Sequence, residues 1–152
     1  MDNQNLFKVA EVQVMYQPIR NPQKVPQIAR SSDAYSIFME HWNANHISLF
    51  EEFKMLLLNR SNRVLGIFNV SSGGVSGTVV DAKLIFAPAL KCLACGLILA
   101  HSHPSGVLMP STPDIQLTKK LKSAGEFLDI TILDHMIITP EGYYSFADEG
   151  AL

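Results

Sequence analysis

Two histidines separated by one residue, His101 and His103, are the residues of this sequence best suited to bind a metal ion. They follow a short apolar stretch at 97–100 that is typical of a central strand. Residues two apart on a strand point to the same side, so both imidazoles can reach one ion. Asp114 falls in the first turn of a predicted helix, from which its carboxylate can fold back beside them. Two nitrogen ligands and one oxygen suit zinc, and three protein ligands leave a fourth position for water, as in catalytic sites.

Structural roles for the same residues stay open at this stage. A histidine at the end of a strand is usually a structural residue, and His-x-His spacing alone does not decide between the two roles. Ser111 and Asp114 also fit a helix N-terminal capping arrangement, in which the hydroxyl accepts from an early amide and the helix dipole favours the carboxylate. For these two residues taken alone, capping is the better interpretation.

A hydrolytic zinc site also uses a general base. Zinc lowers the pKa of a bound water to about 7, and a base can take its proton and pass it to a leaving amine. Glu51 and Glu52 are the candidates.

The residues singled out so far form a known pattern: Glu, then His-x-His, seven residues, Ser, two residues, Asp. In this chain they are Glu51, His101, His103, Ser111 and Asp114. This pattern resembles the JAMM (MPN+) zinc metallopeptidases.

Further stretches resemble the RadC branch of that superfamily. They are residues 100–106 (AHSHPSG), 110–111 (PS), 133–135 (LDH) and 144–150 (YSFADEG), so the resemblance covers roughly residues 30 to 152. One departure is Ser102, because RadC proteins typically have Asn between the two histidines. By strand parity this middle residue points away from the metal, so ligation is not put in doubt.

The resemblance implies a role for each residue of the motif. His101, His103 and Asp114 would bind zinc, Glu51 would activate the zinc-bound water, and Ser111 would help to stabilise the oxyanion. The implied reaction is hydrolysis of an amide or isopeptide bond in a peptide or protein substrate.

The strand pattern gives an independent reason to choose between the two glutamates. Glu52 shares a strand face with Lys54 and is expected to pair with it in solvent. Glu51 shares its face with Phe53, Met55 and Leu57. Glu51 is therefore the predicted inward-facing base.

The remaining cysteines and histidines receive simpler interpretations. Cys92 and Cys95 lie near the end of a predicted helix rather than at its electropositive start, so core packing is expected. A nucleoside deaminase would need His-x-Glu followed by Pro-Cys-x-x-Cys, and this sequence has neither. His41 and His46 are interpreted as surface residues, and His135 is a candidate to support a metal ligand.

The predicted elements form an α/β, or mixed α+β, arrangement, with a central mixed sheet flanked by helices. The resemblance implies the JAB/MPN-like architecture, which is related to that of cytidine deaminases. The elements are a strand at 10–16, a helix capped near 31–33, a hairpin of strands at 53–58 and 63–70, a connecting loop at 71–77, a helix from Asp81 to about Cys95 closed by Gly96, a strand at 97–100, a helix from 111–114, and strands at 130–139 and 143–146 joined by a turn.

Length and composition favour one soluble domain over residues 1–152. The chain has 47% hydrophobic and 17% charged residues, enough for one core. The net charge of −2 gives no basic excess for a phosphate backbone, so direct DNA binding is not expected. The start lacks a secretory signal, and the longest uncharged apolar run, at 92–100, is too short to span a membrane. A cytoplasmic location is expected.

Two rival functions remain beside a zinc peptidase. RadC relatives carry a DNA-repair label, so the chain could be a repair-associated accessory factor. Longer relatives carry a helix-hairpin-helix module that relies on glycines, and since the first glycine here is Gly66, this module is expected to be missing. The third candidate is a catalytically silent binding module, which metal content would separate from an enzyme.

Overall fold

A five-stranded mixed sheet forms the centre of the computed structural model, which describes residues 8–73 and 80–152. The strand order is β2-β1-β3-β4-β5. Strands β3 and β4 run parallel, and the other neighbouring pairs are antiparallel. The strands are β1 (Glu52–Leu58), β2 (Val64–Ser72), β3 (Gly96–Ser102), β4 (Thr131–Thr139) and β5 (Gly142–Ser145).

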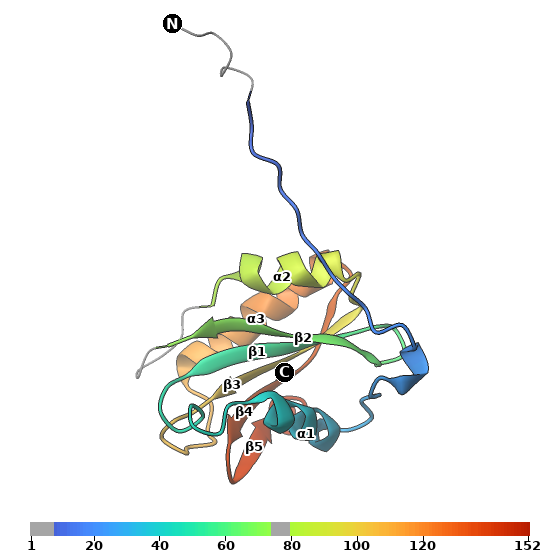
Figure 1. The fold of residues 1–152 in the computed structure, drawn as a ribbon. Helices are drawn as coiled ribbons and strands as arrows, with labels where there is room; N and C mark the ends of the chain where they lie inside the picture. The colour runs from blue at the N-terminus through green and yellow to red at the C-terminus, as the bar shows by residue number, and fades with distance from the viewer. Residues whose placement is uncertain (1–7, 74–79) are drawn as a thin grey trace, which may run out of the picture.

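Helices cover both faces of the sheet (Figure 1). Helix α1 (Ser31–His41) packs on one face, and α2 (Ala82–Lys91) and α3 (Thr112–Phe127) pack on the other. A 3-10 turn, η2 (Pro22–Lys24), precedes α1. The predicted mixed α/β class with a helix-flanked sheet is therefore confirmed, as are the hairpin of β1 and β2, the helix near residue 31 and the two C-terminal strands.

Strand β3 sits in the middle of the sheet, and all seven of its residues are buried. Leu97 and Leu99 face the core under α2 and α3, whereas Ile98 and Ala100 face the core under α1. The same alternation continues to the end of the strand. It directs His101 to the α3 side and Ser102 to the α1 side.

The strand predicted at 10–16 is wrong. This segment is extended but belongs to no strand, and Val12 is 87% exposed. Its one described anchor is the Tyr16 hydroxyl, which donates to the carbonyl of Leu65 at 2.7 Å. Alternating apolar residues form a strand only where a sheet edge and a core accept them, and within the described chain β2 pairs with β1 alone.

The helix predicted from Asp81 to about Cys95 begins as expected but ends earlier. The Asp81 carboxylate caps it by accepting from the amide of Lys83 at 2.9 Å. The helix ends at Lys91, and Leu93 then takes a left-handed φ of 53° that turns the chain. Gly96 is therefore the first residue of β3 rather than a helix cap. A Cβ at Gly96 would lie 2.8 Å from the side chain of Leu133, so close strand packing explains this glycine.

The connecting loop predicted at 71–77 is shorter at its start, because Ser71 and Ser72 belong to β2. Residues 74–79 lie outside the described part of the chain, so the interpretation of this Gly/Ser-rich stretch as a plain connection stays a prediction. No helix among the described residues is long and apolar enough to cross a bilayer.

Candidate metal centre

The two histidines of the motif lie at the C-terminal end of β3, His101 within the strand and His103 directly after it. His101 pairs with Phe53 of β1, and the two rings stack with their centroids 6.0 Å apart. His101 is 3% exposed, while His103, just past the strand, is partly buried. The buried strand thus holds one candidate ligand inside the core and places the second at its edge.

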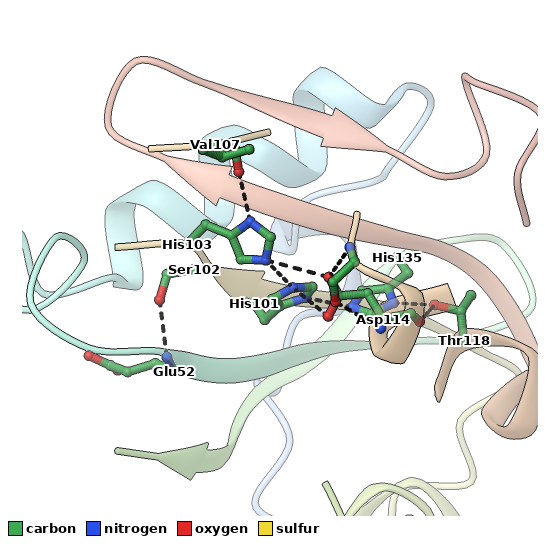
Figure 2. Close-up of polar contacts among 9 residues, drawn as sticks. Glu52, His101, Ser102, His103, Val107, Asp114, Thr118 and His135 are labelled. Carbon is green, nitrogen blue, oxygen red and sulfur yellow. Dashed lines mark hydrogen bonds and ion pairs between the residues drawn. The ribbon is translucent and has the colours of Figure 1, made fainter. Parts of the chain in front are cut away.

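The third candidate ligand comes from the first turn of α3. The Asp114 Oδ1 atom lies 3.3 Å from His101 Nε2, and its Oδ2 atom lies 3.6 Å from His103 Nε2. The two Nε2 atoms are 3.0 Å apart. Figure 2 shows the two imidazoles and the carboxylate converging on one point. Among the described residues, this is the one group of three whose donor atoms all lie within 4.8 Å of one another.

Hydrogen bonds on the far sides of the rings orient both histidines. His103 Nδ1 lies 2.7 Å from the carbonyl oxygen of Val107. A carbonyl can only accept, so Nδ1 of His103 carries a proton and its Nε2 is turned toward Asp114. This Nε2 donates to the carboxylate when it is protonated and offers a lone pair to a metal ion when it is not. His101 Nδ1 lies 2.8 Å from His135 Nε2. The predicted support of a ligand by His135 is thus present in the geometry, with His135 fully buried.

The electrostatics of the cluster keep the carboxylate ionised. Burial would raise the pKa of Asp114, but hydrogen bonds with His101 and His103 outweigh it and hold that pKa well below its ordinary value. The bond with Asp114 raises the pKa of His103, although burial opposes it, and the charge of Glu51 adds to the rise. Burial lowers the pKa of His135 well below its ordinary value, so this ring is neutral.

The donor set fits a zinc ion. It offers two imidazole nitrogens and one ionised carboxylate oxygen, a combination that zinc accepts in tetrahedral sites. Ligands tied down by outer hydrogen bonds are also typical of metal centres. His101, His103 and Asp114 therefore form a group that could bind a metal ion.

Ser111 takes the capping position that its sequence context indicated. Its hydroxyl accepts from the amide of Asp114 at 3.2 Å, and its own amide donates to Asp114 Oδ2 at 2.7 Å. This reciprocal box begins α3 and fixes the carboxylate of Asp114. Ser111 is exposed, and a hydrogen bond from its side chain also helps to lower the pKa of Asp114.

The two candidate bases, Glu51 and Glu52, differ in surroundings. Glu51 lies just before β1, is partly buried, and its charge acts on His103. Glu52 pairs with Lys54 at 3.2 Å, as expected, but the pair is buried rather than in solvent, with the two residues 7% and 5% exposed. The reason is that Trp42, at the end of α1, and His46, in the turn after it, lie against Lys54 and Glu52. The amide of Glu52 donates to Ser102 Oγ at 3.0 Å (Figure 2). Ser102 therefore faces away from the metal group, the cluster of His101, His103 and Asp114.

Two interactions were not expected from the sequence. His46, interpreted as a surface residue, is only partly exposed and lies 3.2 Å from the Glu52 carboxylate. Thr118 contacts His135 at 2.6 Å. Its position one turn after Asp114 is the only signal in the sequence that could have indicated it.

The prediction for His41 is confirmed, and the prediction of core packing holds for one of the two cysteines. His41 is exposed, as expected. Cys92 is partly buried against the core, and burial raises the pKa of its thiol. Cys95 is partly exposed and lies outside the two core clusters, so core packing holds for Cys92 only.

Comparison with known proteins identifies the family of the chain. The model of the RadC-like JAB domain matches residues 28–151. A UPF0758 protein of Flavobacterium johnsoniae is 50% identical over 128 residues, which are 84% of this chain and 54% of that protein. A UPF0758 protein of Porphyromonas gingivalis is 48% identical over 103 residues, which are 67% of this chain and 45% of that protein.

A third relative matches nearly the whole chain. A UPF0758 protein of Syntrophotalea carbinolica is 34% identical over 149 residues, 95% of this chain and 65% of that protein. The chain thus spans about half to two thirds of the length of these relatives. On these matches the chain belongs to the RadC-like JAB-domain family, within a superfamily that includes metallohydrolases.

Proposed function

We propose that this protein is a zinc-dependent metallohydrolase that cleaves an amide or isopeptide bond in a peptide or protein substrate. The observation that carries the proposal is the convergence of His101, His103 and Asp114, with all donor atoms within 4.8 Å, at the end of a buried strand. Membership of the JAB-domain family supports hydrolysis as the reaction class.

Each residue of the motif has one task in this proposal. His101, His103 and Asp114 hold the ion, and the carboxylate charge of Asp114 offsets part of its positive charge. When bound, zinc supplies Lewis acidity toward the scissile carbonyl and lowers the pKa of water. Glu51 takes the proton of the attacking water and returns it to the leaving amine. Ser111 donates its hydroxyl proton to the developing oxyanion.

The test measures metal content and hydrolysis on the same preparations. Purified wild-type protein, dialysed with zinc and then freed of excess metal, should retain about one zinc per chain. Asp114→Asn should retain much less, and Ser102→Ala, which alters the residue between the two histidines, should match the wild type. Wild-type protein without stoichiometric zinc would refute the metal centre.

Cleavage is then tested with a mixed peptide library and an isopeptide-linked reporter, using Asp114→Asn as the inactive control. Zinc-dependent cleavage that is absent in this variant supports the enzyme. A zinc-loaded chain that cleaves nothing in either format would instead favour a binding module.

We also propose that the chain does not act by holding duplex DNA directly. Its net charge is −2, and non-specific DNA affinity comes from basic side chains that neutralise phosphates. Fluorescence anisotropy at physiological salt should therefore show only weak binding. A submicromolar, salt-sensitive affinity would reverse the order of the repair-factor and peptidase hypotheses.

A further inference from the structure

A line of hydrogen-bonding groups runs from His101 back to the residue that supplies the third ligand. His101 Nδ1 lies 2.8 Å from His135 Nε2, and His135 Nδ1 lies 2.6 Å from Thr118 Oγ1. Thr118 Oγ1 in turn donates to the main-chain carbonyl of Asp114 at 2.7 Å (Figure 2). His101, His135 and Thr118 are 3%, 0% and 2% exposed, so water does not compete for these bonds.

The chemistry of the groups gives this line a direction. A carbonyl only accepts, so the single hydroxyl proton of Thr118 points to Asp114. The Thr118 oxygen must then accept from His135, which places a proton on His135 Nδ1. With the single ring proton on Nδ1, His135 Nε2 has a lone pair that can accept from His101. His101 must therefore donate from Nδ1 to His135. A neutral His101 ring then has its lone pair on Nε2, the atom that lies near His103 and Asp114 and that would bind the ion.

We propose that Thr118 and His135 are positioning residues that select the metal-binding tautomer of His101. Asp114 would then act at both ends of the arrangement, through its carboxylate at the ion and through its carbonyl at Thr118. The inference rests on the proposed function, since it takes the ion to be zinc. The Nε2 atoms of His101 and His103 lie 3.0 Å apart, close enough for both to bind one ion.

A simpler explanation covers part of the geometry. Threonine inside a helix commonly bonds to the carbonyl four residues earlier, and this alone accounts for the bond from Thr118 to Asp114. It does not account for the 2.6 Å contact with a fully buried histidine. On the simpler explanation, loss of the Thr118 hydroxyl would leave zinc affinity unchanged.

The first experiment measures zinc affinity of the full chain by competition with a chromophoric chelator. Thr118→Val removes the hydroxyl and should weaken zinc binding about 10–100-fold, the usual effect of losing a partner of a ligand. Thr118→Ser keeps the hydroxyl and should stay within about threefold of the wild type. Ser36→Ala is the matched control, because Ser36 in α1 makes the same helical bond, to the carbonyl of Ser32, far from the metal group.

His135→Phe is a second route to the same answer. It removes both ring nitrogens but keeps an aromatic ring that can stack on Phe146, whose centroid is 5.1 Å away. The variant should lose zinc affinity at least as much as Thr118→Val. The double variant should lose little more than His135→Phe alone, because both changes break one line of bonds.

The second experiment reads the tautomer directly. Long-range proton–nitrogen correlation spectra of the zinc-loaded, nitrogen-15 labelled protein should show His135 protonated on Nδ1, which is the less common form of a neutral histidine. An Nε2-protonated His135, or Thr118→Val with wild-type zinc affinity, would overturn the positioning role alone. Failure of the wild type to bind zinc would overturn the proposed function as well, so the two failures are distinguishable.

Discussion

Adjacent glutamates, Glu51 and Glu52, have different surroundings. Glu52 is the first residue of β1 and points to the α1 side, where it pairs with Lys54 and His46. Glu51 precedes it, and its charge acts on His103 on the α3 side. Strand parity predicts opposite faces for neighbouring residues, which would separate the buried, paired carboxylate of Glu52 from the proposed catalytic carboxylate of Glu51.

This separation predicts that the two conservative substitutions have opposite effects. Glu51→Gln should keep the fold and the zinc but lower the rate of hydrolysis about 10²–10⁴-fold, because it removes a general base and no ligand. Glu52→Gln should keep zinc affinity and the rate of the folded protein, yet lower the free energy of unfolding by about 3 kcal/mol, because it leaves a buried lysine without its charge partner.

Zinc titration, a peptidase assay and denaturant unfolding of both variants check this prediction. Loss of zinc in Glu51→Gln would make Glu51 a ligand rather than a base. Loss of activity in folded Glu52→Gln would transfer the role of base to Glu52.

Residues whose positions follow from local geometry were predictable from the sequence. His101 and His103 follow from strand parity, and Asp114 with Ser111 follows from the start of a helix. Thr118 and His46 were not predictable in the same way, because their partners lie 17 residues away on β4 and on a different element reached through a loop. Such contacts depend on how elements pack, which spacing along the chain does not encode.

At the scale of elements, α3 must lie close to β4 to bring Asp114 over His101. Gly125 near the end of this helix allows that approach. A Cβ at this position would lie 2.3 Å from the carbonyl oxygen of Ile130, and the amide of Ile130 donates back to Gly125 at 2.8 Å. The glycine thus lets the chain reverse tightly from α3 into β4.

Gly125→Ala should therefore destabilise the protein, against the usual trend. Alanine in a helix normally gains up to about 1 kcal/mol over glycine, but the clash with backbone atoms should cost about 1–3 kcal/mol. A net loss of stability in urea unfolding is expected. Ser123→Ala, at an exposed position of the same helix, should change stability by less than about 0.5 kcal/mol. A Gly125→Ala protein more stable than wild type would show that the chain relaxes here without cost.

Helix α1 depends on a carboxylate at its start. Asp33 accepts hydrogen bonds at 2.9 Å from the amides of Ala29 and Arg30, and these bonds lower its pKa below the ordinary 3.8. A carboxyl whose pKa is lower in the folded state stabilises the fold above its unfolded pKa and loses this effect as pH falls through the folded value.

Asp33→Ala should therefore lower the melting temperature at pH 7, and its difference from wild type should shrink as pH falls below about 3.8. Glu40→Ala, which removes an exposed carboxylate at the opposite end of α1, should not lower the melting temperature at neutral pH, because a negative charge there opposes the helix dipole. Thermal melts of the three proteins from pH 7 to pH 2.5 provide the check. A difference for Asp33→Ala that persists at the lowest pH would contradict the capping role of the charge.

Element boundaries show where sequence patterns stop being informative. The cap at Asp81 and the cap at Ser111 were predictable because one side chain and nearby amides make them. The end of α2 was not, because it depends on the left-handed conformation of Leu93, a residue type with no preference for it. The segment at 10–16 has the alternation of a strand, but whether it pairs depends on a neighbouring edge that the pattern does not describe.

At the scale of the whole molecule, the sheet order puts every proposed ligand near its middle. His101 belongs to the central strand, with β1 on one side and β4 on the other, and both cores pack against that strand. Asp114 arrives from the helix that connects β3 to its parallel neighbour β4. The three donors come together only when β3, α3 and the loop between them are all in place, so the unfolded chain has no equivalent site.

Zinc should therefore stabilise the folded protein as a whole. A ligand that binds only the folded state adds about 2.7 kcal/mol at a free concentration 100 times its dissociation constant. For a chain of 152 residues, each kcal/mol shifts the melting temperature by about 2–4 °C, so a rise of roughly 5–11 °C is expected.

Magnesium at the same concentration should give a much smaller shift, because this site offers nitrogen ligands that magnesium does not favour. Asp114→Asn should show a reduced shift with zinc, since it keeps the two imidazoles but loses the charged oxygen. Differential scanning calorimetry on metal-free wild type and variant, with and without buffered zinc, measures each shift. An unchanged wild-type melting temperature at saturating zinc would mean that the convergence of the three side chains is structural and binds no ion.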